Sequence, residues 1–393
     1  MQRCLLLVAL LLWCGGSVPL AAELSPSERE VLKSAKSGQA LQLALATNRN
    51  TLPYLPVTIT PAPGPQFLFS DKPEYFLSDG VSLEETVQAG TVRLYVYHVP
   101  EPAAGGKVIA VVVENPGNTP VQLRFLRRAF PRPGGDYHRI AKEALVGFLS
   151  GEAEPRPRSI APGQRLVLDP NMDAAIATRD QLVHGFYEFE IDGPVRVSVL
   201  QRSPDQESVR ILDDLPRLPS QPAGSTSASG AGRGRFEQAN FDVTLAAGPH
   251  FDTASGAMQL VVADGRRDSW IRGRDGIEAR DARNVGNYGT VYRIRFKRAS
   301  SDGRHLALVL AKLEVVNQYC GAVSAAVLLK RGNAPSALVP LPSTGMFIRQ
   351  PGEVAVIQVF PPLPEGETEE VELVYSPPGA ACLPTPFLLL PID

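Results

Sequence analysis

From residue 52 onward, apolar positions recur mainly with a period of two, the spacing of a strand with one buried face. Residues 92–97 alternate apolar side chains with an arginine and two tyrosines, and residues 121–125 alternate Val, Leu and Phe with Gln and Arg. Both segments therefore predict half-buried strands. Residues 108–113 are apolar at every position, which predicts a strand buried on both faces.

Turn sequences separate the strands of this first half. The segment Asn115-Pro-Gly-Asn118 follows the apolar run and predicts a hairpin with residues 121–125. Asp192-Gly-Pro194 stands between two more strand candidates, 186–191 and 195–200, and predicts a second hairpin. Short strands with frequent turns are typical of a β-sandwich, so we expect residues 51–215 to form the first such domain.

A second group of strands follows a segment rich in Gly and Ser. Residues 216–235 contain a run of small and polar side chains that is too poor in apolar surface to join a core, and they predict a flexible linker. Beyond it, strands are predicted at 292–296, 306–316, 322–329, 354–360, 371–375 and 387–390. The predicted fold is therefore all-β, with two β-sandwich domains of immunoglobulin-like or jelly-roll type, the second over residues 236–393.

Two segments predict short helices. Residues 23–50 include Ser25-Pro-Ser-Glu28, which resembles a helix start, and they are expected to form a helical or mobile lead-in. Residues 138–149 place Ile140, Ala144 and Phe148 on one face of a helix. We expect this second helix to cap one end of the first sandwich.

The N-terminus predicts export. Residues 1–22 combine Arg3, an apolar run and small residues near Ala22, as in a secretory signal peptide, so the protein is expected to be secreted or to reside in the cell envelope. Cys320 and Cys382 are the cysteines beyond this leader, and an even pair in an exported chain predicts one disulfide. Two buried thiols are the alternative.

Composition narrows the classes of partner. The 393 residues carry a formal net charge of −2 and no long run of Lys and Arg, which gives no basis for binding nucleic acid. After the leader, no stretch is apolar for long enough to span a membrane. We expect no cofactor and no metal; a cell-wall polysaccharide or an envelope protein is the expected partner, with the oligomeric state left open.

The segment 264–289 is the densest in charged and aromatic residues and is the best candidate for a binding site. Its arginines can bind carboxylates or phosphates, and its aromatic rings can stack on sugars. The candidate ligand-binding residues are Trp270, Arg272, Arg274, Asp275 and Tyr288. The alternative is a set of surface loops whose charges neutralise one another. The acids in this segment do not have the spacing of a helix-loop-helix calcium site, although an irregular cage of loop oxygens stays open.

No local motif predicts catalysis. The histidines His98, His138, His184, His250 and His305 are scattered without metal-binding spacing, and each is expected to be a surface or capping residue. There is no nucleophile elbow, zinc-protease helix or phosphate loop. Two distant carboxylates, as in glycoside hydrolases, would leave no local signature, so an enzyme remains an alternative.

Four strings carry a resemblance to a known group of proteins: residues 70–78, 93–98, 111–121 and 286–293. They are similar to uncharacterised exported β-rich proteins of Gram-positive spore-formers, some of which carry a copper-amine-oxidase N-terminal-like domain. The resemblance implies residence in the cell envelope and supplies no catalytic residues. Amine oxidase activity is excluded because Asn287-Tyr288 lacks the upstream Thr and the following acid of the cofactor-forming motif.

The leading hypothesis is therefore a non-enzymatic secreted or envelope binding module for a polysaccharide, peptide or protein. The alternatives are a carbohydrate-active or other hydrolase with dispersed carboxylates, and a structural component of a surface layer. Fold alone does not decide between these classes.

Overall fold

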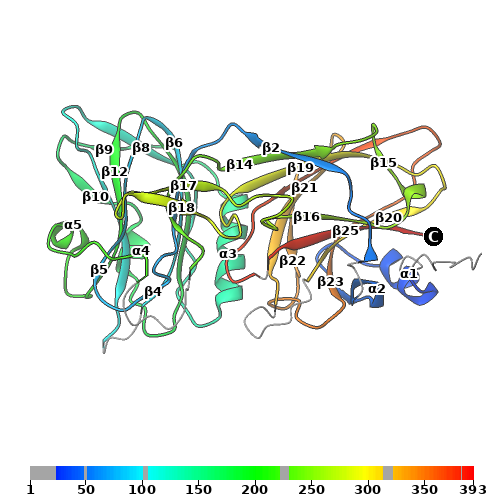
Figure 1. Ribbon diagram of the computed structural model, residues 1–393, viewed down its shortest axis with the longest axis horizontal. Coiled ribbons are helices and arrows are strands. Elements are labelled where there is room, and N and C mark those ends of the chain that lie inside the picture. The colour runs from blue at the N-terminus through cyan, green and yellow to red at the C-terminus, as the bar shows by residue number, and fades with distance from the viewer. Residues whose placement is uncertain (1–23, 48–50, 101–104, 222–229, 313–321, 382) are drawn as a thin grey trace, which may run out of the picture.

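The computed structural model describes residues 24–47, 51–100, 105–221, 230–312, 322–381 and 383–393. The predicted leader over residues 1–22, the middle of the predicted linker, and both Cys320 and Cys382 lie outside these ranges. Within them the chain is all-β, as predicted, with four sheets and a few short helices (Figure 1).

The largest sheet has nine strands and takes them from both halves of the chain. Their spatial order is β18 (Arg280–Arg283), β17 (Arg272–Asp275), β13 (Arg233–Phe236), β3 (Gln66–Ser70), β6 (Gly90–Pro100), β11 (Val183–Ile191), β8 (Val121–Ala129) and β9 (Arg158–Ile160), and β4 (Tyr75–Phe76) also pairs with β6. The pairings of β6 with β3 and with β4 are parallel. The strands β18, β17 and β13 form one edge of this sheet.

A four-stranded sheet covers one face of the nine-stranded sheet. Its order is β10 (Arg165–Val167), β7 (Val108–Glu114), β12 (Val195–Arg202) and β5 (Gly80–Val87). Buried side chains of both sheets belong to one core cluster, in which Val111 and Val199 lie with Leu94 and Phe189. The two sheets therefore pack face to face.

Two further sheets occupy the other half of the molecule (Figure 1). The five-stranded sheet has the order β1 (Ala40–Gln42), β23 (Glu353–Phe360), β20 (His305–Ala311), β25 (Thr385–Ile392) and β16 (Met258–Val262). The seven-stranded sheet has the order β2 (Val57–Ala62), β14 (Asn240–Leu245), β19 (Val291–Ala299), β24 (Glu369–Tyr375), β21 (Ala325–Arg331) and β22 (Ala337–Leu341), and β15 (Phe251–Asp252) pairs with β19. The predicted strands of this half are confirmed within the described ranges.

One continuous core joins the two halves. It contains side chains of the five- and seven-stranded sheets together with those on the second face of the nine-stranded sheet. The helix α3 (Tyr137–Ser150) lies in the middle of the molecule, and Phe148 stacks on Phe186 with ring centroids 3.7 Å apart (Figure 1). The predicted helix is confirmed, but the expectation that it caps one end of a sandwich is wrong, because its apolar face is buried between the halves. The other helices are α1 (Pro26–Lys33), α2 (Ala44–Thr47), α4 (Pro170–Ala174), α5 (Ser208–Ile211) and the 3-10 helix η2 (Thr253–Ser255).

Both predicted hairpins are wrong in the same way. β7 and β8 are consecutive along the chain, as are β11 and β12, yet each pair is divided between the four-stranded and nine-stranded sheets. The turns at 115–118 and 192–194 therefore carry the chain from one sheet to the facing sheet. A turn signal predicts reversal of the chain, but it does not specify which strands pair afterwards.

The predicted boundaries need correction at both ends of the first half. β2 lies within the expected first domain but pairs with β14 of the expected second domain. β13 begins inside the expected linker and pairs with β3. The lead-in is also docked, because β1 pairs with β23 and Leu32 of α1 is buried in the core beside the five-stranded sheet.

Candidate functional site

The outer edge of the nine-stranded sheet carries a group of exposed arginines on β18, β17 and β13. The register places Arg272 directly opposite Arg283, Arg274 opposite Asp281, and Arg235 opposite Arg274. Residues paired in this way point to the same face of a sheet. We call the face formed by Arg235, Arg272, Arg274 and Arg283 the arginine surface.

The charge of the arginine surface is only partly compensated, by Asp281 opposite Arg274 on the same face. Arg274 Nη2 and Arg235 Nη1 each donate a hydrogen bond of 3.1 Å to a backbone carbonyl. In the ranges that the structure describes, none of the four arginines forms an ion pair with a carboxylate, whereas Arg280 on the same hairpin pairs with Glu278 at 2.6 Å. Like charges directly opposite each other destabilise strand pairing. The Arg272–Arg283 pair is therefore not explained by stability.

Glycines allow the strands of this edge to approach closely. A Cβ atom on Gly232 would lie 2.1 Å from the Arg283 carbonyl oxygen, and one on Gly234 would lie 2.2 Å from the Arg274 carbonyl oxygen. Both glycines have positive φ angles, +159° and +126°, which L side chains rarely adopt. The alternation Gly-Arg-Gly-Arg over residues 232–235 thus places hydrogen atoms against the hairpin backbone and arginines on the opposite side.

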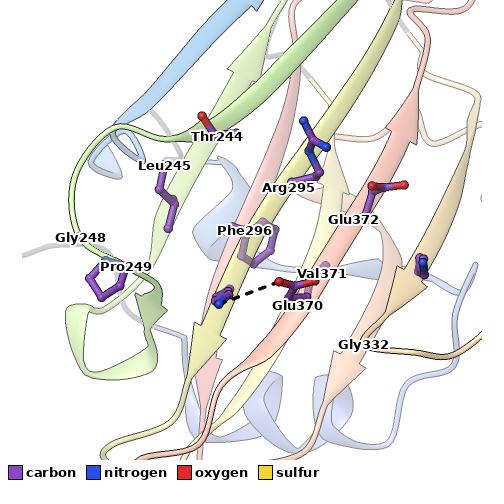
Figure 2. A pocket seen from close by; sticks show the side chains of 12 residues that line it. Thr244, Leu245, Gly248, Pro249, Arg295, Phe296, Gly332, Glu370, Val371 and Glu372 are labelled. Atoms are coloured by element: carbon purple, nitrogen blue, oxygen red, sulfur yellow. Dashed lines mark ion pairs between the residues drawn. The ribbon is translucent and has the colours of Figure 1, made fainter.

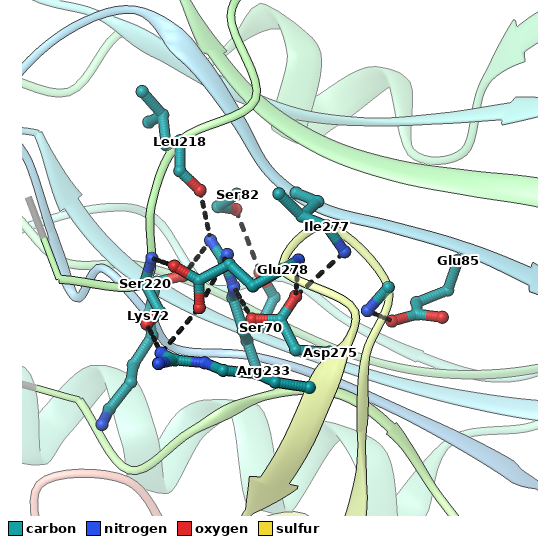
Figure 3. Close-up of polar contacts among 12 residues, drawn as sticks. Ser70, Lys72, Ser82, Glu85, Leu218, Ser220, Arg233, Asp275, Ile277 and Glu278 are labelled. Carbon is teal, nitrogen blue, oxygen red and sulfur yellow. Dashed lines mark hydrogen bonds and ion pairs between the residues drawn. The ribbon is translucent and has the colours of Figure 1, made fainter.

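A buried arginine anchors the hairpin (Figure 3). The Arg233 side chain is 1% exposed, and its Nε donates to Asp275 Oδ2 at 2.7 Å while its Nη1 donates to the Leu218 carbonyl at 2.7 Å. Asp275 Oδ1 in turn accepts the backbone N–H groups of Ile277 and Glu278 at the hairpin tip. This ion pair therefore fixes the end of β17 to the start of β13.

The hairpin tip has two more attachments. Glu278 accepts the Ser220 N–H at 2.9 Å; partial burial opposes its ionisation, but this bond and the charges of Arg233 and Arg280 lower the pKa of Glu278. Glu85 Oε1 on β5 accepts the Gly276 N–H at 2.7 Å. The tip is thus tied to the four-stranded sheet, and the arginine surface is supported on rigid elements.

Two open hollows flank the hairpin. One has a volume of about 540 Å³ and is lined by Arg235, Arg274 and Asp281, together with Gln66. The other has a volume of about 190 Å³ and includes Lys72 in its wall, beside Arg280 and Arg283 of β18. In the larger hollow Arg235 and Arg274 are balanced by Glu237 and Asp281, whereas four cations and two acids line the smaller one. The smaller hollow therefore favours anionic groups.

The structure brings together three of the five candidate residues. Arg272 and Arg274 belong to the arginine surface and are exposed. Asp275 lies directly beneath it, buried in the ion pair with Arg233. Its role here is to hold the hairpin, because its carboxylate is already bound.

Trp270 and Tyr288 do not join this group. The half-buried Trp270 ring lies against Gly265, where an added Cβ would be 2.5 Å from Trp270 Cε2. The half-buried Tyr288 donates its hydroxyl to the Ala381 carbonyl at 3.4 Å. Each ring therefore has a contact within the protein, and neither residue belongs to β17 or β18.

Sequence reasoning missed the residues of β13. Arg233 and Arg235 fall in the segment predicted as linker, whose content of Gly and Ser dominated that interpretation. Their period-two alternation with Gly was the available signal for a strand. Arg283 lies within the candidate segment, but only the register shows that it opposes Arg272.

A buried histidine resembles part of a nucleophilic dyad. Ser70 Oγ lies 2.8 Å from His98 Nε2, and His98 Nδ1 lies 2.8 Å from the Pro73 carbonyl oxygen. Burial lowers the pKa of His98 to about 3, and the side chains of Ser70 and His98 are both 0% exposed. No substrate reaches this pair in the described structure. His184 is buried as well, so the expectation of surface histidines is wrong for these two residues.

A third hollow, of about 460 Å³, lies on the seven-stranded sheet (Figure 2). Its charges are paired across strands, with Arg295 2.9 Å from Asp242 and Lys297 3.9 Å from Glu370. Such ladders of opposite charges stabilise a sheet. Arg295 and Lys297 of this surface therefore have acidic partners, unlike the four arginines of the arginine surface.

The described residues give no support for a metal site or a membrane-spanning helix. Among the described residues, no three or more His, Cys, Asp or Glu side chains gather as metal ligands would. No helix in the same part of the chain has both the length and the apolar character needed to cross a membrane. No known family model matches the chain, and no curated protein matches its sequence significantly.

Proposed function

We propose that this protein is a non-enzymatic binding module of the cell envelope or the extracellular space, and that it binds an anionic polymer at the arginine surface. The observation that carries the proposal is that some arginines of β13, β17 and β18 form ion pairs and others do not. Arg233 and Arg280 have acidic partners, whereas Arg272 and Arg283 oppose each other and have none among the described residues. A ligand that carries negative charge would complete the surface.

The chemistry of the surface favours carboxylate or phosphate groups. Guanidinium groups present several N–H donors in a plane and bind both kinds of anion with two parallel hydrogen bonds. Arg272 and Arg274 are two residues apart on one strand, which spaces them by roughly 7 Å along it. A row of charges on an open hollow suits a linear polymer with repeated acidic groups better than a single small anion.

The predicted export of the chain supports a wall polymer as the ligand. The predicted leader over residues 1–22 and the resemblance to exported proteins both favour the cell envelope. Acidic polysaccharides and phosphate-bearing polymers are the anionic polymers of that compartment. The absence of an aromatic platform beside the described arginines favours recognition by charge over recognition by stacking on sugar rings.

The test is equilibrium binding of the purified chain to three soluble polymers: polygalacturonate, poly(glycerol phosphate) and neutral dextran. Binding to either acidic polymer, weakening as salt is added, and no binding to dextran support the proposal. The preferred acidic polymer identifies the anionic group. Equal binding to dextran, or no binding to either acidic polymer at low salt, would contradict it.

Two alanine variants locate the site. Arg274→Ala is expected to weaken binding because it removes a guanidinium from the larger hollow. Trp270→Ala is the matched control from the same sequence segment, and it is expected to leave binding unchanged because its ring lies against Gly265. The reverse pattern would move the site away from the arginine surface.

A further inference from the structure

Two carboxylates hold the segment that leads into β13. Asp71, which directly follows β3, accepts the Ala231 N–H on Oδ2 at 2.5 Å and donates its own N–H to the Gly232 carbonyl at 3.0 Å. Glu74, three residues further on, accepts the N–H of Gly230. Consecutive amides of one segment are therefore bound by two acids of one turn.

The segment that begins at Gly230 packs closely against the turn that begins at Asp71. Gly230 has a φ of +95°, and a Cβ atom at this position would lie 1.9 Å from the Asp71 carbonyl oxygen. The next residues of the same segment form β13, which stands between β3 and the β17–β18 hairpin in the sheet. The contact at Asp71 and Glu74 therefore secures the strand through which the hairpin joins the rest of the sheet.

Asp71 has an oxygen with no partner. Its side chain is 6% exposed, and Oδ1 is buried without a hydrogen bond among the described residues. A buried carboxylate oxygen without a donor is costly, and the cost rises when a second carboxylate lies nearby. A proton on Oδ1 would remove both penalties.

The electrostatic surroundings of Asp71 also favour its protonated form. Burial, followed by the charge of Glu74, raises the pKa of Asp71 well above its ordinary value of 3.8, and burial raises the pKa of Glu74. Lys72 opposes the effect on Asp71. The other titratable groups that face the pair stay neutral near pH 7. Burial lowers the pKa of His98, which is hydrogen-bonded to the Pro73 carbonyl, and raises the pKa of the phenols on Tyr95 and Tyr97 of β6, Tyr137 of α3 and Tyr288.

We propose that Asp71 and Glu74 form a proton-dependent clasp: they share one proton, and in that state they hold the Gly230 and Ala231 amides and fix the start of β13 to the end of β3. The inference goes beyond ligand binding and stands independently of it. The proton comes from solvent when the clasp closes and returns to solvent when it opens.

The direction of the pH effect follows from proton linkage. The closed clasp binds a proton that the opened segment releases above about pH 4, so the stability of the clasp is complete at low pH and is lost as the pH rises through the raised pKa. The equilibrium constant for opening is expected to increase about tenfold for each pH unit within that window.

Hydrogen exchange of residues 230–236 tests the clasp, measured by mass spectrometry between pH 5 and pH 8 and corrected for intrinsic exchange rates. The wild type is expected to open more readily as the pH rises, by up to about tenfold per unit while the pH is below the raised pKa. Asp71→Asn keeps an acceptor for the Ala231 N–H but removes one of the two titrating carboxyls, so the pH dependence of opening should be weaker; Glu74→Gln should weaken it in the same way. In the double variant Asp71→Asn/Glu74→Gln, opening should be independent of pH.

Asp192→Asn is the matched control. Asp192 is an exposed aspartate whose Oδ1 accepts the Gln122 N–H at 2.7 Å, with no second acid beside it in this structure. The Asp192→Asn variant should show the same pH dependence of opening at residues 230–236 as the wild type. Opening that is independent of pH in the wild type, or a pH dependence in the double variant equal to that of the wild type, would overturn the proposal.

Discussion

Replacing Arg233 with methionine tests whether one buried ion pair holds the arginine hairpin. The side chains of Arg233 and Asp275 are 1% and 5% exposed, and methionine retains much of the packing volume while removing the charge. Asp275 would then be a buried carboxylate without its partner. Removing one member of a buried pair costs about 3–5 kcal/mol, because the remaining charge is uncompensated.

Urea unfolding measures this cost, with Arg124→Met as the matched control. Arg124 pairs with Glu190 at 2.7 Å, but their side chains are 38% and 44% exposed, so its loss should cost less than about 1 kcal/mol. The double variant Arg233→Met/Asp275→Asn leaves no buried charge and keeps an acceptor for the Ile277 N–H. It should therefore be more stable than Arg233→Met alone.

Two results would refute this reasoning. A cost for Arg233→Met no greater than that for Arg124→Met would mean that the buried pair does not hold the hairpin. A double variant less stable than the single variant would mean that the cost comes from lost packing, because neutralising Asp275 would then bring no relief.

Two further predictions follow from the glycines and the histidines. Gly234→Ala should release the hairpin and expose it to proteolysis, because its methyl group would lie 2.2 Å from the Arg274 carbonyl oxygen. Gly163→Ala is the control and should not increase proteolysis, since φ is also positive there but no atom lies within 4 Å. Equal sensitivity of both variants to proteolysis would contradict the steric argument. His98 and His184, whose pKa values burial lowers to about 3 and about 4, should show neutral imidazole signals in NMR spectra at pH 5. In the unfolded chain these rings are protonated at a higher pH than in the folded protein, so they reduce the stability of the fold as the pH falls below about 6.5. Titration of either ring near pH 6.5 in the folded protein would exclude this contribution.

The two-residue periodicity of apolar side chains was sufficient to predict the class of fold and the positions of most strands. The alternation in residues 92–97 and 121–125 is confirmed in β6 and β8, and the fully apolar run at 108–113 is confirmed in β7, a strand with neighbours on both sides. These signals are local, because each strand buries the side chains that its own sequence supplies. Strand pairing is not local, and the exchange of β2 and β13 between the two halves depends on contacts between distant segments.

The candidate site was only partly predictable for the same reason. Arg272 and Arg274 stand out in a charged segment, but their opposition to Arg283 and Arg235 depends on register. The clasp at Asp71 lies outside the segment that sequence reasoning selected, since it forms only when residues 230–232 return to the end of β3. Small residues in a Gly-rich run can mark a close approach of backbones as well as a flexible linker.

Charge reversal at Arg272 tests most directly the claim that the arginine surface binds an acidic polymer, because it separates the effect on binding from the effect on stability. Arg272→Glu converts a like-charge pair with Arg283 into an opposite-charge pair, so the variant should be more stable by about 0.2–1 kcal/mol while it loses affinity for the acidic polymer that the wild type binds. Arg210→Glu, which makes the same change of charge at a side chain 80% exposed on α5, should bind as the wild type does. Unchanged binding by Arg272→Glu, or an equal loss in Arg210→Glu, would contradict the assignment of the arginine surface as the binding site.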